Sequence, residues 1–542
     1  MKVTAIRLTI GIAVCAIAAT LVISPARVRS AAGWPSAETI SAAGSDNSSW
    51  LLPARTYSGN RYVEMPQVTP QNVATLKKAW KFKLDDDSPI ETSPVVWNGT
   101  MYVTSAHDHV YAVDAKTGTL KWKFAYKPHV IAFAANRGVA LVDGHVFLGT
   151  LDGHIISLDA TTGKKVWDIV GVHDTKNSFY TMQPVPYKNM LLMGVSNGDW
   201  GGIGYVTAFN QADGKRVWEW KTIPGPGEAG HETWSGDSWK RGGAAVWSGL
   251  AIDEKSDTLY ADLGNPQPDF FGESRKGDNL YSNSMVALDI SGTPKIKWYH
   301  QFIKHDTHDW DPAMPPVRFT GKIAGESREL VAAGDKGGNF WVLDATDGKL
   351  VYHQAVSTQK GQNTEPTRDG NLACPNTNGG VEYNGGSYDP QTNMFYVPSV
   401  DECGIWKKLP RATYLAGQFY LGGLFPAQSG PTTGWMNAID ISTGKFAWRK
   451  KEALPAVGGA LATSTGLVFS GMLTGQFEAF DAMTGKIVWH DATGSPILAP
   501  PSAYVIDGKQ FVAVASGQAG NQLVKDMPQV STGGSFLTAY TL

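Results

Sequence analysis

One short phrase recurs seven times along this chain of 542 residues and constrains its fold more than any other feature. In each copy a short apolar strand ends in an Asp or Asn, a turn containing Gly follows, and an aromatic residue opens the next strand. The pattern predicts hairpins in which the Asp side chain caps its own turn, Gly supplies a positive φ, and the aromatic ring packs between neighbouring sheets. The copies are Asp114/Gly118/Trp122, Asp159/Gly163/Trp167, Asn210/Gly214/Trp218, Asp289/Gly292/Trp298, Asp344/Gly348/Tyr352, Asp440/Gly444/Trp448 and Asp481/Gly485/Trp489.

Hairpins repeated at intervals of tens of residues are typical of a β-propeller. The regular part begins at residues 80–82 and ends in the strand-like residues 536–540, so we expect the two termini to complete the ring. The fold predicted is therefore all-β, an eight-bladed β-propeller closed by the two termini. The long gaps between Gly214 and Gly292 and between Gly348 and Gly444 are expected to hold functional loops.

Composition agrees with one large β-domain. The chain has 60 Gly, 30 Pro, 19 Trp and only 18% charged residues, as many tight turns and buried aromatics require. Its net charge of −2 gives no reason to expect binding to nucleic acid or to an anionic membrane surface.

The first 32 residues have the features of a secretory signal peptide. Lys2 and Arg7 flank the start of an apolar run at residues 8–23, and small residues follow up to residue 32. We expect export and no stable membrane insertion once the signal is removed, which leaves residues 33–542 as a single domain. An uncleaved membrane anchor is the alternative, because the run is near the lower limit for a membrane span.

Two cysteines lie outside that segment. Cys374 and Cys403 predict one structural disulfide in an oxidising compartment, with two buried free thiols as the alternative. No Cys-x-x-Cys-His motif occurs, so the chain carries no c-type haem of its own.

Carboxylates crowd one short segment. Asp306, Asp309 and Asp311 lie beside His305 and His308, and oxygen ligands at this density suit a hard cation. A solvated acidic loop is the alternative interpretation.

Several motifs resemble those of the PQQ-dependent (quinoprotein) alcohol dehydrogenases, the methanol and ethanol dehydrogenase family. They are LGNPQP at 263–268, KGDNLYSNS at 276–284, NRGVA at 136–140, HDTHD at 305–309 and GGALAT at 458–463. The resemblance covers nearly the whole chain after the signal segment. It implies an eight-bladed propeller that binds pyrroloquinoline quinone (PQQ) and a metal ion on the ring axis.

By motif, the resemblance implies that Asp199, Asn265 and Asp309 bind the metal, with Asp309 also the general base that takes the hydroxyl proton of the alcohol. Family members usually have Glu where this chain has Asp199. Asp311 matches a carboxylate that the lanthanide-using branch adds, so we expect a lanthanide ion or Ca²⁺, with the lanthanide preferred.

The same resemblance implies a PQQ pocket with Trp247 as its aromatic floor. Arg137 and Lys336 supply cations, and polar contacts come from Thr181, Ser196 and Glu91.

Four further places depart from the family pattern. Ile131 and Ala132 replace adjacent cysteines, Val457 replaces a frequent Trp, Glu382 replaces an Asn, and His308 replaces an aromatic beside the base. Without the Trp at Val457 the pocket is expected to be roomier, so methanol is not the preferred substrate.

The function expected is periplasmic oxidation of an alcohol to an aldehyde or ketone, with electrons passed to a separate cytochrome c or similar acceptor. One alternative is a catalytically silent propeller that binds other proteins. Another is a dehydrogenase of the same family that acts on a polyol, sugar or polymeric alcohol.

Overall fold

The computed structural model describes residue 1 and residues 33–129, 134–519 and 533–542. The predicted signal segment therefore lies outside it, apart from residue 1. In the described ranges the chain is almost entirely strand and loop, with one short α-helix, α1 (Ala37–Ser41), and no helix of the length and apolar character that crossing a membrane requires. The 3₁₀-helices are η1 (Ala42–Ser45), η2 (Val73–Thr75), η3 (Gly198–Trp200), η4 (His231–Thr233), η5 (Ser238–Arg241) and η6 (Gly272–Ser274).

Antiparallel sheets follow one another along the chain. Within the described residues there are seven four-stranded sheets, one five-stranded sheet and one three-stranded sheet. The first four contain β3–β6 (Val95–Trp97, Thr100–Thr104, Val110–Asp114, Leu120–Phe124), β7–β10 (Ala140–Val142, His145–Gly149, His154–Asp159, Lys165–Val170), β11–β14 (Val185–Tyr187, Met190–Gly194, Tyr205–Asn210, Arg216–Lys221) and β15–β18 (Leu250–Asp253, Thr258–Leu263, Ser284–Asp289, Lys295–Gln301).

The later sheets are less regular in their chain order. They contain β19–β22 (Val317–Ile323, Glu326–Gly334, Asn339–Asp344, Leu350–Ala355); β24, β25, β28 and β29 (Ser387–Asp389, Met394–Asp401, Thr433–Asp440, Lys445–Glu452); β30–β33 (Leu461–Thr463, Leu467–Gly471, Gln476–Asp481, Ile487–Ala492) with β1 (Tyr62–Val63) added in parallel; and β2, β36, β35 and β34 (Lys77–Lys83, Phe536–Thr541, Lys509–Ser516, Ser502–Ile506).

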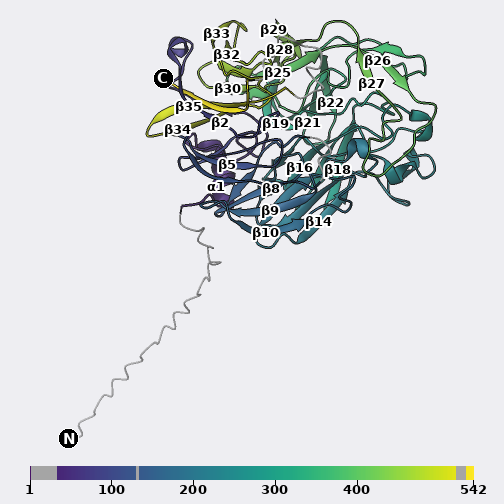
Figure 1. The fold of residues 1–542 in the computed structure, drawn as a ribbon, viewed down its shortest axis with the longest axis horizontal. Coiled ribbons are helices and arrows are strands. Elements are labelled where there is room, and N and C mark those ends of the chain that lie inside the picture. The colour runs from purple at the N-terminus through teal and green to yellow at the C-terminus, as the bar shows by residue number, and fades with distance from the viewer. Residues whose placement is uncertain (2–32, 130–133, 520–532) are drawn as a thin grey trace.

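The two ends of the chain complete one sheet, as the sequence predicted. Strand β2 pairs antiparallel with β36, with Lys81 opposite Thr538. In Figure 1 the label of β2 accordingly lies near that of the yellow β35, from which β36 separates it in the sheet. A buried cluster that includes Trp80 and Tyr540 packs beneath this junction. The all-β prediction is confirmed, and the number of sheets with four or more strands is consistent with eight blades.

The repeated aromatic residue docks each sheet onto the next. The Trp122 ring lies against Gly163, where an added Cβ would come within 2.5 Å of the ring. Its indole N–H donates to the carbonyl of Ala160, the residue after the turn Asp159, at 3.0 Å. Equivalent indole hydrogen bonds run from Trp80 to Ala115, Trp167 to Gln211, Trp298 to Ala345 and Trp448 to Ala482.

The copy at Asp289 is the exception. Gly292 does not have a positive φ, and no atom lies within 4 Å of the position that a Cβ would occupy there, so the predicted role of this glycine is wrong. The spacing explains the difference, because Gly292 follows its Asp by three residues whereas Gly163 follows Asp159 by four. Among the described residues, Trp218 of the preceding sheet has no hydrogen-bond partner for its indole N–H.

The three-stranded sheet is an insertion made of two segments, one between β22 and β24 and the other between β25 and β28. It consists of β23 (Asn371–Ala373), β26 (Gly404–Lys408) and β27 (Gly423–Gln428), and β26 and β27 are at the upper right of Figure 1. The predicted disulfide between Cys374 and Cys403 is present and joins the ends of β23 and β26.

Candidate active site

A cavity of about 510 Å³ lies where the connections between successive sheets come together. Small-molecule sites typically have volumes of roughly 300–1,000 Å³. All of the residues predicted for the site line this cavity: Glu91, Arg137, Thr181, Ser196, Asp199, Trp247, Asn265, Asp309, Asp311 and Lys336. The structure thus brings together positions that are up to 245 residues apart, the separation of Glu91 and Lys336.

Backbone hydrogen bonds fix the connections that carry these side chains. The N–H of Ser93 donates to the carbonyl of Arg137, whose own N–H donates to the carbonyl of Thr181, both at 3.0 Å. On another side of the cavity the N–H of Lys336 donates to the carbonyl of Asp311 at 2.8 Å. Each segment is therefore held by the next, which gives a rigid frame for the side chains.

Asp306 shapes the loop that presents Asp309. Its carboxylate accepts hydrogen bonds from the backbone N–H groups of His308 and Trp310, both at 2.8 Å, and from the side chain of Asn283 at 3.2 Å. Asp309 itself has a φ of +56°, in the left-handed region that non-glycine residues rarely adopt. Such backbone strain is concentrated at functional sites. Asp306 is thus a structural residue, although it belongs to the carboxylate run that the sequence analysis singled out.

His308 behaves as an aromatic residue. Its ring stacks on Trp310 with centroids 4.2 Å apart and planes 13° apart, and Trp406 of the insertion packs edge-on at 4.8 Å. Burial lowers the pKa of His308 to about 4, so the ring is neutral near pH 7. Its replacement of the family's usual aromatic therefore keeps the packing beside Asp309.

Lys336 lies between two carboxylates. Its ammonium nitrogen is 3.1 Å from Asp309 and 3.1 Å from Asp311. Burial disfavours the charged lysine, but Asp309 and Asp311 outweigh this effect and hold the pKa of Lys336 well above its usual value. Burial also raises the pKa of Asp309 well above its usual range, with Lys336 opposing the rise. A carboxylate with a raised pKa is the stronger proton acceptor.

Sequence reasoning missed one acidic residue of the site. Asp269 is fully buried, and one of its carboxylate oxygens lies within 4.8 Å of carboxylate oxygens of both Asp199 and Asp309. Asp199, one of these two neighbours of Asp269, is a carboxylate whose pKa is raised by burial to about 6. Asp269 directly follows the LGNPQP motif, and this place in the sequence was the only feature that could have identified Asp269 as a site residue.

Most of the predicted cofactor residues form one connected group, and Lys336 reaches it, with its ammonium nitrogen 5.7 Å from the centroid of the Trp247 ring. Arg137 donates to the Thr181 hydroxyl at 2.7 Å and forms an ion pair with Glu91 at 2.9 Å. The Thr181 and Ser196 hydroxyls are hydrogen-bonded at 2.7 Å. The guanidinium of Arg137 lies over the ring of Trp247, 4.9 Å from its centroid.

Two further residues, Tyr383 and Glu382, lie in the cavity with this group of cofactor residues. The ring of Tyr383 lies on the Arg137 guanidinium at 4.2 Å, and its hydroxyl has no hydrogen-bond partner among the described residues. Glu382 lines the cavity beside it, and burial raises its pKa to about 7. Tyr383 was not predicted, because a lone tyrosine carries no sequence signal of its position in a ring.

These groups fit the cofactor that the sequence analysis expected. A flat tricarboxylate requires an aromatic surface, cations and hydroxyl donors, which Trp247, Arg137, Lys336 and Thr181 supply. Val457 is buried against Leu498, which lines the cavity. Ile131 and Ala132 lie outside the described residues.

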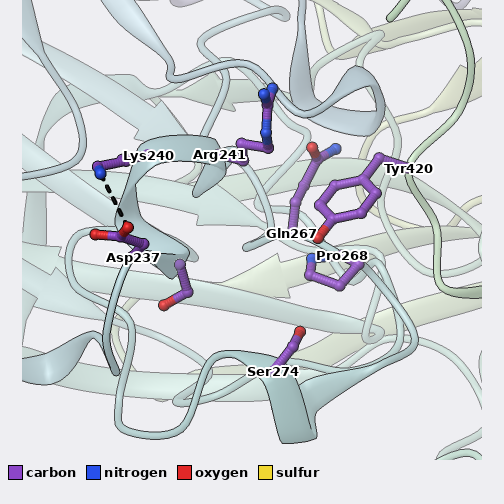
Figure 2. A pocket seen from close by; sticks show the side chains of 8 residues that line it. Asp237, Lys240, Arg241, Gln267, Pro268, Ser274 and Tyr420 are labelled. Atoms are coloured by element: carbon purple, nitrogen blue, oxygen red, sulfur yellow. Dashed lines mark ion pairs between the residues drawn. The ribbon is translucent and has the colours of Figure 1, made fainter. Parts of the chain in front are cut away.

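A second, smaller cavity of about 290 Å³ lies on the other side of the segment that contains Gln267. Figure 2 shows Tyr420 beside Gln267 and Pro268, and the ion pair between Lys240 and Asp237, which measures 3.0 Å. None of the predicted site residues lines it.

Comparisons with known proteins agree on one family. The family model described as "PQQ: Glucose/ethanol/alcohol dehydrogenase, beta-propeller domain" matches residues 50–360 and 421–512. The unmatched residues between these ranges include β23, β26 and both cysteines of the disulfide.

Named relatives and solved structures agree with this match. The quinoprotein alcohol dehydrogenase PedH of Pseudomonas putida is 33% identical over 85% of this chain and 85% of its own length. The lanthanide-dependent methanol dehydrogenase of Methylacidiphilum fumariolicum is 31% identical over 87% of this chain and 85% of its length. A solved europium-containing methanol dehydrogenase superposes with a TM-score of 0.85 at 29% identity, covering 93% of this chain and all of the other. The chain therefore belongs to the family of PQQ-dependent alcohol dehydrogenases and is an oxidoreductase of that family.

Proposed function

We propose that this protein oxidises an alcohol to an aldehyde or ketone, with PQQ and one metal ion bound in the 510 Å³ cavity. The observation that carries the proposal is the position of Asp309, a strained and buried carboxylate 3.1 Å from Lys336 in a cavity that also contains aromatic and cationic side chains. We further propose that the sheets form an eight-bladed ring around this cavity.

Arg137, Thr181, Ser196, Trp247 and Glu91 would hold PQQ, and Asp199, Asn265, Asp309 and Asp311 would hold the metal ion. When bound, PQQ supplies the two-electron acceptor and the metal ion a Lewis acid.

Asp309 accepts the proton of the alcohol hydroxyl at a carboxylate oxygen that lines the cavity. Lys336 stabilises the ionised form of Asp309 before the proton arrives and holds the side chain in position.

The wall of the cavity near Asp199 is aromatic. Phe179, Trp200, Phe419 and Phe425 contact one another in a row, at centroid distances of 5.0, 4.4 and 5.3 Å. An apolar wall of this size excludes water and favours alcohols with a carbon chain larger than that of methanol.

Sequence features support the proposed cellular location and the proposed electron acceptor. We propose that residues 1–32 direct export to the periplasm and are removed, leaving residues 33–542 as the working domain. Because the sequence has no Cys-x-x-Cys-His motif, electrons pass to a separate cytochrome c or similar acceptor.

Reconstitution tests the proposal. The purified protein is loaded with PQQ, supplied separately with Ca²⁺ and with La³⁺, and assayed by dye reduction with methanol, longer primary and secondary alcohols, polyols and sugars. Turnover with the longer alcohols supports the proposal. Turnover with polyols or sugars alone would replace the substrate class, and failure to bind PQQ with either metal would contradict the function.

A further inference from the structure

Asp269 has an unusual environment for a carboxylate. It is fully buried, and neither carboxylate oxygen has a hydrogen-bond partner among the described residues. Leaving a buried charge unpaired costs several kcal/mol, on the order of the penalty for transferring an ion out of water. A cation from outside the chain is one source of such a partner, and Asp269 lies with Asp199 and Asp309 in a group of carboxylates that could share one.

Arg275 acts on the charge of Asp269 but forms no ion pair with its carboxylate in the described part of the chain. Arg275 is also fully buried, but its guanidinium donates to the backbone carbonyls of Pro268 and Asp269, at 3.2 and 3.1 Å, and to the side chain of Asn279 at 2.9 Å. These bonds fix the backbone at Asp269 and leave its carboxylate unpaired.

The chain also holds the Asp199 and Asp269 segments to each other. The N–H of Gly201 donates to the side-chain carbonyl of Gln267 at 2.5 Å. From the insertion, the N–H of Tyr420 donates to the carbonyl of Asp199 at 2.7 Å, and the N–H of Phe270 donates to the carbonyl of Leu421 at 2.8 Å. Figure 2 shows Tyr420 beside Gln267. The proximity of the two carboxylates is therefore built into the backbone.

We propose that Asp269 is a ligand of the metal ion in addition to the expected set, and that it shifts the preference of the site towards a trivalent ion. The inference rests on the proposed function, because it concerns the same site. Asp199, Asp269 and Asp309 each place a carboxylate oxygen within 4.8 Å of the others, as oxygen ligands of one hard cation require.

The charge of the site supports a trivalent ion. Asp199, Asp269, Asp309 and Asp311 carry four negative charges when ionised, against the positive charges of Lys336 and of Arg275, whose charge acts on Asp269. Asp269 thus adds one negative charge to the carboxylates around the ion, and each added carboxylate favours an ion of higher charge. The unpaired amide nitrogen of Asn265, which is also buried, shows that the polar groups around the site are not satisfied by the described part of the chain alone.

The test uses Tb³⁺ as the probe and Asp269→Asn as the variant. Metal-free, PQQ-loaded protein is titrated with Tb³⁺, and luminescence lifetimes in H₂O and D₂O count the waters on the bound ion. We expect Asp269→Asn to weaken Tb³⁺ binding by about tenfold or more, since even groups that only orient ligands contribute about 10- to 100-fold. The bound ion should gain about one water, and Ca²⁺ binding should weaken less.

Asp262→Asn is the matched control. Asp262 on β16 is likewise buried with both carboxylate oxygens unpartnered among the described residues, but it is not part of the carboxylate group of Asp199, Asp269 and Asp309. The Asp262→Asn variant should bind Tb³⁺ like the wild type.

Thermal melting gives a second measurement. Without metal, Asp269→Asn should melt at or above the wild-type temperature, because the substitution removes an unpaired buried carboxylate. The gain in Tm on adding La³⁺ should be smaller for Asp269→Asn than for the wild type.

Two results would count against the inference in different ways. If Asp269→Asn binds Tb³⁺ with wild-type affinity and hydration, Asp269 is not a ligand, while the proposed function stands. If the wild-type protein binds neither Tb³⁺ nor PQQ, the proposed function falls with it.

Discussion

His308 and Trp310, the two neighbours of Asp309 in the chain, stack face to face with centroids 4.2 Å apart. The two rings form a clamp that fixes the backbone on both sides of the carboxylate. Trp406 from the disulfide-linked insertion packs against the His308 ring, and Trp310 donates its indole N–H to the carbonyl of Pro375 at 3.2 Å. The insertion therefore supports the residue proposed as the catalytic base.

The clamp predicts opposite results for two substitutions at His308. His308→Phe keeps the stacking and loses only the 3.4 Å hydrogen bond between Nδ1 and the Thr307 hydroxyl, because Nε2 has no partner among the described residues. We expect near wild-type turnover and stability for this variant. His308→Ala removes the contact with both indoles and should lower turnover by about tenfold or more through misplacement of Asp309. Turnover per bound PQQ is the measurement, and full activity of the Ala variant would show that the clamp is not needed.

The docking of Trp122 on Gly163 predicts a stability difference between two glycines. Gly163 and Gly466 both have a positive φ, at +70° and +83°, but only Gly163 has a ring where a Cβ would be placed. Gly466→Ala should cost about 1 kcal/mol for its backbone conformation. Gly163→Ala should cost about 1 to 3 kcal/mol more, because the ring must move. Denaturant unfolding measures both, and equal losses would mean that the contact with Trp122 contributes nothing.

Much of the fold could be predicted from the sequence because the repeated phrase has a local cause. An Asp such as Asp159 accepts the backbone N–H groups of its own turn, as at Thr162, so the turn is specified within a few residues. The docking of Trp122 follows from the same repeat in the next sheet. The prediction for Gly292 was wrong because this glycine follows Asp289 by three residues, whereas Gly163 follows Asp159 by four. The repeated phrase was defined by residue types and did not fix this spacing.

The candidate site was only partly predictable. Residues such as Asp309 were identified through motifs, and the structure places all of them on one cavity. Asp269 and Tyr383 were missed because their roles depend on contacts with segments distant in the chain. Asp306 is the reverse case: its sequence context suggested a ligand, but its carboxylate caps a loop. Spacing alone cannot separate a carboxylate that binds backbone N–H groups from one that faces a cavity.

Glu478 predicts a pH dependence of stability that is separate from catalysis. It lies buried on β32, and burial raises its pKa to about 7, with Glu452 adding to the rise. Because the folded pKa exceeds the unfolded value near 4.5, stability is highest at low pH and falls as the pH rises towards 7 and beyond. Glu478→Gln removes this loss. We expect its Tm to match the wild type at pH 5 and to exceed it at pH 8 by about 2 °C.

The control for this prediction is Glu326→Gln, which alters an exposed residue at the start of β20. It should leave the difference between pH 5 and pH 8 unchanged. A constant Tm difference between Glu478→Gln and the wild type across this range would mean that Glu478 ionises normally in the folded protein.

The most direct test of the proposed chemistry is the turnover of Asp309→Asn. The variant keeps the size of the side chain and removes its ability to accept a proton, so PQQ and the fold should be retained. We expect turnover with a saturating alcohol to fall by about 10²- to 10⁴-fold per bound PQQ, while Asp262→Asn stays at the wild-type rate. Unchanged turnover of Asp309→Asn with PQQ bound would contradict its role as the base and, with it, the proposed mechanism.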